Sequence, residues 1–154
     1  MMLIVRFVHF LGSALWIGGA VAAMVLAFGA GRESVEVRVG LFRLLTQVQT
    51  LVIGLGALLT VGTGIVWSMW LVQDGGEPGI HSIGLWLMQG LGLLGAVLVL
   101  FVAVPTAVKV GGLAVTTDDG QLLPAFEYLR RRQVLVSSVA TLLAILSLFA
   151  GVVL

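Results

Sequence analysis

The chain has 154 residues, of which 60% are hydrophobic and 10% are charged, and its formal net charge is +1. A soluble domain of this length carries about 25% charged residues and covers its surface with polar groups, so this composition indicates a membrane protein. It excludes intrinsic disorder, a nucleic-acid-binding domain and a soluble hydrolase. The absence of cysteine from the sequence also removes disulfides, iron–sulfur clusters, thiolate zinc sites and thiol catalysis.

Four apolar stretches are long enough to cross a bilayer, whose hydrocarbon core needs roughly 20 helical residues. They are continuously apolar rather than alternating, which favours helices over the strands of a membrane barrel. We therefore predict an all-α fold, an integral membrane four-helix bundle with up-down topology, formed by one domain over residues 1–154. The predicted spans cover about residues 2–30, 44–72, 80–108 and 134–154.

The distribution of charge predicts the orientation. Seven of the eight basic residues lie in the links after the first and third spans, whereas the link at residues 73–79 carries only the acidic Asp74 and Glu77. The positive-inside bias places the basic links in the cytoplasm, with both termini on the outer, periplasmic side of the bacterial inner membrane. The seven basic residues are Arg32, Arg38, Arg43, Lys109, Arg130, Arg131 and Arg132.

Two helices are predicted to begin before their spans. Ser34 can cap a helix that runs through Arg38 and Arg43 into the second span, and Pro124 suits the first position of a helix that leads into the fourth. An alternative for the first span is a secretory signal peptide that ends near residues 27–30, although its apolar run is about twice as long as a signal core.

Small residues at four-residue spacing mark one face of each of three spans. We expect these faces to pack helix against helix within the bundle, because small residues let backbones approach closely in lipid. A homodimer seam and a flat surface for a cofactor are the alternatives. The three sets are Ala14-Gly18-Ala22, Gly56-Thr60-Gly64 and Gly92-Ala96.

Glutamines are the largest uncharged polar side chains within the spans. Gln47 and Gln49 lie near the cytoplasmic end of the second span, where we expect water to satisfy their hydrogen bonds. Gln89 lies deeper in the third span, so its amide needs a partner inside the bundle.

His9, in the outer third of the first span, is the strongest candidate for a ligating residue. Gly12, Ser13 and Trp16 follow it three, four and seven positions on, which places them on the same helix face. A neutral imidazole is a good ligand for haem iron or copper, and small neighbours would leave room for a flat macrocycle. The alternative is an interfacial histidine that bonds a neighbouring carbonyl.

His81, at the outer start of the third span, is the second candidate ligand. Gly84 and Met88 continue its helix face, and the first and third spans run in the same direction, so both histidines fall on the outer side. A haem b held between His9 and His81 is the resulting hypothesis, although their depths differ by on the order of 9 Å at 1.5 Å per residue. A solvated loop histidine beside Glu77 is the alternative for His81.

The segment His9–Gly19, with the sequence HFLGSALWIGG, resembles a known group of small bacterial membrane proteins. It is similar to the first span of proteins related to the copper-resistance protein D (CopD) domain and of the HemJ type of protoporphyrinogen oxidase. The length of four spans and Pro105 near the end of the third span agree with that group. In HemJ-like proteins the first-span histidine is associated with haem, which the resemblance implies for His9 alone. The lysine expected early in the third span is absent, so porphyrinogen oxidation is not implied.

These observations lead to three hypotheses of function. The first is a haem b-binding membrane protein with an electron-transfer or redox-associated role. In this hypothesis His9 is an axial ligand and His81 is a possible second ligand. Any enzymatic activity would be that of a haem-dependent oxidoreductase. The second is copper handling or transport through the two histidines with Met69 or Met88. The third is a cofactor-free structural or accessory subunit. The expected partners are the lipid bilayer and a homodimer or larger membrane complex, without nucleic acid.

Overall fold

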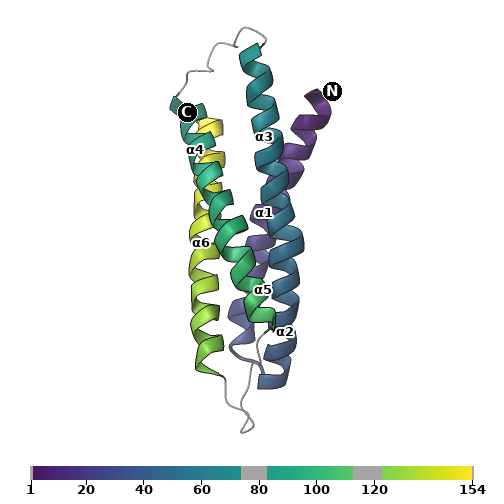
Figure 1. The fold of residues 1–154 in the computed structure, drawn as a ribbon, viewed down its shortest axis with the longest axis vertical. Coiled ribbons are helices and arrows are strands. Elements are labelled where there is room, and N and C mark those ends of the chain that lie inside the picture. Colours follow the sequence, from purple (N-terminus) through teal and green to yellow (C-terminus); the bar gives the residue numbers. More distant parts are fainter. Residues whose placement is uncertain (1, 74–82, 113–122, 154) are drawn as a thin grey trace.

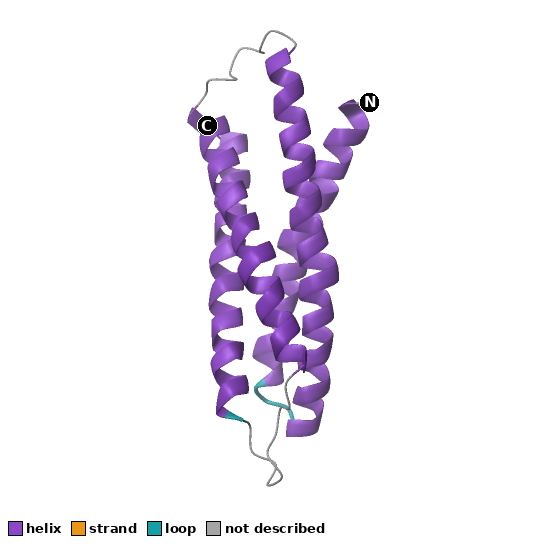
Figure 2. Ribbon diagram, viewed as in Figure 1, coloured by secondary structure: helices purple, strands orange, loops and turns teal. Residues whose placement is uncertain are grey.

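The computed structural model describes residues 2–73, 83–112 and 123–153, and every element in these segments is helical (Figure 2). The helices join into four long rods, each long and apolar enough to cross a membrane. The prediction of an all-helical bundle with four candidate membrane spans is therefore confirmed.

Two of the four rods consist of three consecutive elements each. The first rod is α1 (Met2–Ala30), and the last is α6 (Pro124–Val153). The second rod is formed by α2 (Val35–Gln47), η1 (Val48–Gly54) and α3 (Leu55–Gln73). The third rod is formed by α4 (Ile83–Leu98), η2 (Val99–Ala103) and α5 (Val104–Gly112).

The two predicted extensions are confirmed. Pro124 is the first residue of α6, and Ser34 is the N-cap residue of α2, although its side chain makes no capping hydrogen bond. Successive rods run in opposite directions, and the start of α1 and the end of α6 lie at the same end of the bundle (Figure 1). The most extensive packing joins α1 to α3 and α4 to α6.

The contact between α1 and α3 is a contact of backbones. A Cβ atom added to Gly56 would lie 2.6 Å from the Trp16 amide nitrogen and 2.8 Å from the Gly12 carbonyl oxygen. A Cβ on Gly12 would meet the Gly56 carbonyl oxygen and the Thr60 amide nitrogen at 2.9 Å. The predicted use of the Gly56-Thr60-Gly64 face for packing inside the bundle is thus confirmed, because only glycine permits this approach.

Small residues also bring α4 against α6. A Cβ on Gly92 would lie 3.0 Å from the Ser147 hydroxyl, and Ala96 is completely buried. Toward the end of α6, the Met88 sulfur packs directly on Gly151. The expectation for the Gly92-Ala96 face is therefore confirmed as well.

On α1 the prediction of the packing face is wrong. Ala14, Gly18 and Ala22 are all exposed on the surface of the bundle, and the face that points inward carries Gly12, Trp16 and Ala20 instead. Trp16 explains the difference, because its large ring fills the centre of the bundle and determines how α1 is rotated.

Two π-helical segments interrupt the middle rods and contact each other. The segment η2 ends just before Pro105. A proline ring inside a helix clashes with the carbonyl group four residues earlier, here that of Phe101, and the wider π turn relieves this clash. No proline lies in η1 or in the helix α3 that follows it, and nothing in its sequence predicts the π turn.

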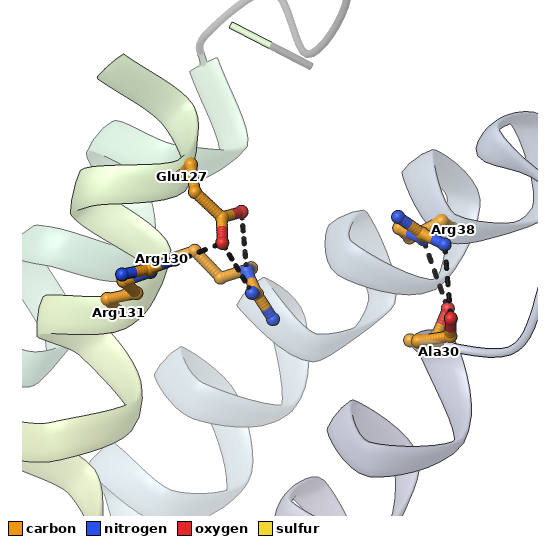
Figure 3. Close-up of polar contacts among 6 residues, drawn as sticks. Ala30, Arg38, Glu127, Arg130 and Arg131 are labelled. Atoms are coloured by element: carbon orange, nitrogen blue, oxygen red, sulfur yellow. Dashed lines mark hydrogen bonds and ion pairs between the residues drawn. The ribbon is translucent and has the colours of Figure 1, made fainter. Parts of the chain in front are cut away.

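Polar contacts lie at the end of the bundle where α1 ends and α6 begins (Figure 3). Arg38 donates from Nε to the Ala30 carbonyl oxygen at 3.1 Å, which satisfies one of the free carbonyls at the end of α1. On α6, the Glu127 carboxylate accepts hydrogen bonds from Arg130 at 2.8 and 3.1 Å and from Arg131 at 3.3 Å. At the same end of the bundle, the rings of Phe42 and Phe126 meet edge to face and belong to a small second hydrophobic core.

Candidate functional site

His9 lies on the seam between α1 and α3, about two turns into the first helix. Its Nδ1 atom is 3.2 Å from the Thr63 hydroxyl, which itself donates to the Leu59 carbonyl oxygen at 2.5 Å. Because the Thr63 proton is directed to a carbonyl, the Thr63 hydroxyl oxygen is placed to accept a hydrogen bond from a protonated His9 Nδ1. In the neutral imidazole, this geometry assigns the proton to Nδ1 and the lone pair to Nε2.

The imidazole ring is fixed on several sides. Its Nδ1 and Cε1 atoms are the ring atoms nearest to Gly64, where an added Cβ would lie 3.5 and 3.2 Å away. The rings of Trp67 and Phe10 meet it edge-on, with centroid distances of 5.9 and 6.1 Å. The Arg6 guanidinium lies 4.8 Å from the centroid of the Trp67 ring, so this cation is held by an aromatic face toward the N-terminal end of α1.

The three residues predicted to flank His9 share its seam but contact α3 or the core. Ser13 donates its hydroxyl to the His9 carbonyl oxygen at 2.9 Å and approaches the Thr60 hydroxyl at 3.4 Å. Gly12 touches the backbone of α3, and Trp16 is 1% exposed in the centre of the bundle. The surface over Gly12 is thus already covered by a helix.

The predicted residues of the third span lie elsewhere. Gly84 is buried in α4, and Met88 packs on α6, where its carbonyl oxygen accepts a hydrogen bond from Ser147 at 2.7 Å. His81 lies outside the residues that the structure describes. For the copper hypothesis, Met69 is 58% exposed on α3, whereas the Met88 sulfur packs on Gly151 of α6.

Among the described residues, His9 fits the role of a haem ligand, but Gly12 does not fit the role of a pocket wall. His9 supplies the required tautomer, since a ligating histidine leaves Nε2 free and donates its other ring proton to an oriented acceptor, here Thr63. The expected wall of Gly12 does not fit, because a macrocycle could lie there only if α1 and α3 separated. A planar group at His9 must therefore approach from the Nε2 side of the ring, away from Gly64 and Thr63.

Two glutamines test the expectations for polar groups inside the spans. Gln89 donates from Nε2 to the Ser68 hydroxyl at 2.8 Å, so the predicted partner exists. The prediction for Gln49 is wrong, because this residue is 5% exposed and lies under α6 instead of in water. Its Oε1 atom accepts a hydrogen bond from Ser137 at 3.2 Å.

A pattern in the sequence of α6 indicates the polar residues that lie near Gln49. Gln133, Ser137 and Thr141 recur every four residues, which places a polar stripe on one face of α6. In the structure all three line a cavity together with Gln49.

No protein-family model, curated protein or solved structure matches this chain. The functional argument therefore depends on its own residues.

Proposed function

We propose that this is a multi-pass protein of the bacterial inner membrane that binds haem b through His9 and has an electron-transfer or redox-associated role. The supporting observation is the hydrogen-bond chain from His9 Nδ1 through the Thr63 hydroxyl to the Leu59 carbonyl oxygen, which leaves Nε2 as the free donor atom. Haem b, when bound, supplies an iron that accepts and releases one electron.

In this proposal each described residue has a limited role. His9 ligates, and Thr63 sets the orientation of the ring and raises the basicity of Nε2 by accepting a hydrogen bond from Nδ1–H. Trp67 packs against the ring and restricts its rotation. His81 remains the proposed second ligand on the basis of its position in the sequence.

The first prediction is spectroscopic. Purified protein, as isolated or after addition of haemin, is expected to show a Soret band that His9→Ala abolishes. Thr63→Val should weaken haem binding by about 10–100-fold, because it removes the group that orients the ligand. Thr60→Val is the matched control: the same substitution one turn earlier removes the Ser13 contact but not the partner of His9 Nδ1, and binding should persist.

A preparation that stays colourless and takes up no added haemin would contradict the proposal, as would a Soret band of full intensity in His9→Ala. Metal analysis of the same samples separates the alternatives. Copper without porphyrin would support copper handling, whereas no cofactor, together with unchanged stability in His9→Ala, would support a structural subunit.

The second prediction concerns orientation, which we propose from the clustering of the basic residues. The sequence contains no cysteine, so a single introduced thiol can be labelled without background. In spheroplasts, a membrane-impermeant maleimide should label Met2→Cys and should not label Ser34→Cys until the membrane is permeabilised. The reverse pattern would overturn the proposed periplasmic location of the termini and, with it, of His9.

A further inference from the structure

A cavity lies in the half of the bundle opposite His9, between α1, the second rod, α5 and α6. Its volume is about 180 Å³. Apolar cavities of about 150 Å³ in proteins accept a benzene molecule, so this space is large enough for one substituted six-membered ring. Its lining includes Ala27, Ile53, Ala107 and Ser138 in addition to the four polar residues introduced above.

Two amide groups in the lining are incompletely bonded. Ser137 donates to Gln49 Oε1 at 3.2 Å and accepts from Gln133 Nε2 at 3.3 Å. Within the described part of the chain, Gln49 Nε2 and Gln133 Oε1 are buried and have no hydrogen-bond partner. A buried unpaired polar group is destabilising, so a donor and an acceptor left free around one hydroxyl indicate a missing polar partner.

The backbone at Gln49 is also unusual. Gln49 belongs to η1, a π-helical segment that no proline explains. π turns within α-helices are frequently found at functional sites. The unpartnered amide of Gln49 and the π turn therefore coincide at the same residue.

The surroundings of the cavity define the character of the occupant. Met24 and Phe28 on α1 and Val134 on α6 line the cavity and are exposed on the outside of the bundle, so the opening faces the lipid. Arg130 also lines it, but its guanidinium is already engaged by the Glu127 carboxylate through two hydrogen bonds. An uncharged, lipid-soluble molecule suits this setting better than an anionic headgroup.

We infer that the cavity binds the uncharged ring of a membrane-soluble molecule of the quinone class. In the oxidised form a ring carbonyl accepts a hydrogen bond from Gln49 Nε2, and in the reduced form the hydroxyl at that ring position accepts this bond and donates its own proton to Gln133 Oε1. An apolar tail leaves between α1 and α6. This inference concerns binding alone. It does not depend on the proposed function of His9, which lies toward the other end of the bundle.

The test measures uptake of duroquinone, a single-ring quinone, by the full-length protein in lipid nanodiscs, with empty nanodiscs as the background for partitioning into lipid. Saturable uptake above this background is expected for the unchanged protein. Gln49→Leu should weaken it at least tenfold, because leucine keeps the volume and removes the donor. Ala27→Phe should abolish it, because the added ring fills the cavity.

Two controls separate binding from folding. Gln89→Leu is the same substitution at an amide outside the cavity, and His9→Ala removes the proposed haem ligand; both should keep full uptake. The thermal midpoint of Gln49→Leu should stay level, since the change removes the buried unpaired Nε2 group as well as the Oε1 atom that accepts a hydrogen bond from Ser137.

Absence of saturable uptake by the unchanged protein would overturn the inference. Uptake by Gln49→Leu and by Ala27→Phe at the level of the unchanged protein would overturn it as well. Loss of the fold in Gln49→Leu would assign the amide to packing and would overturn it as well.

Discussion

Replacing Gly56 by alanine is expected to destabilise the bundle by at least about 2 kcal/mol, although it adds one methyl group. That group would lie 2.6 Å from the Trp16 amide nitrogen and 2.8 Å from the Gly12 carbonyl oxygen. Both atoms belong to the backbone of α1 and cannot rotate away, so α1 and α3 must move apart. Overpacking of a close contact typically costs about 1–3 kcal/mol, and separation of two backbones belongs to the upper part of that range. The thermal unfolding midpoint of the detergent-solubilised protein measures the effect.

Gly62 provides the matched control on the same helix. An added Cβ there has no atom within 4 Å, so Gly62→Ala introduces no clash. It should leave the midpoint unchanged or raise it, because alanine has the higher helix propensity. Equal midpoints for Gly56→Ala and Gly62→Ala would show that α1 and α3 do not meet through their backbones.

The sequence predicted the helical rods well because their signals are local. Continuous apolar runs can satisfy their backbone groups in lipid only as helices, and the cap at Ser34 and the proline at Pro124 mark helix starts directly. Pro105 was also visible in the sequence, and the π turn before it follows from the proline geometry.

The rotation of α1 could not be read from the sequence. In water the polar face of a helix identifies its apolar core face, but in lipid both faces are apolar and this contrast disappears. Two stripes with four-residue spacing were available, Ala14-Gly18-Ala22 and Gly12-Trp16-Ala20, and the small residues favoured the first. The structure buries the second because the Trp16 ring fills the centre.

The contacts of the candidate sites also depend on how the helices pack, which the sequence does not show. His9 could be identified as chemically distinctive, whereas its acceptor Thr63 depends on the register between α1 and α3, which no local pattern encodes. The position of Gln49 near the end of the second predicted span led us to expect that water reaches its side chain. The rings of Phe42 and Phe126 and the first turns of α6 extend the protein core past that depth, so the amide is buried.

The second large effect is expected at Trp16, the largest fully buried side chain among the described residues. Its ring contacts Gly95 of α4 and belongs to a core with Ile53, Val99 and Ala140, so it joins all four rods. Truncation of a buried tryptophan to alanine costs about 3–5 kcal/mol in soluble proteins. Inside a membrane the transfer to water contributes less, while the lost contacts and the cavity remain, so we expect about 3 kcal/mol for Trp16→Ala.

Two further substitutions determine what the tryptophan does. Trp86, which is 65% exposed, should tolerate alanine with a loss below about 1 kcal/mol. Trp16→Phe should be less harmful than Trp16→Ala, because it keeps a ring in the core and removes an indole nitrogen that has no partner among the described residues. If Trp16→Ala instead leaves the unfolding midpoint unchanged and alters only the haem spectrum, Trp16 belongs to a cofactor wall and not to the core, and α1 must be rotated differently from the arrangement described above.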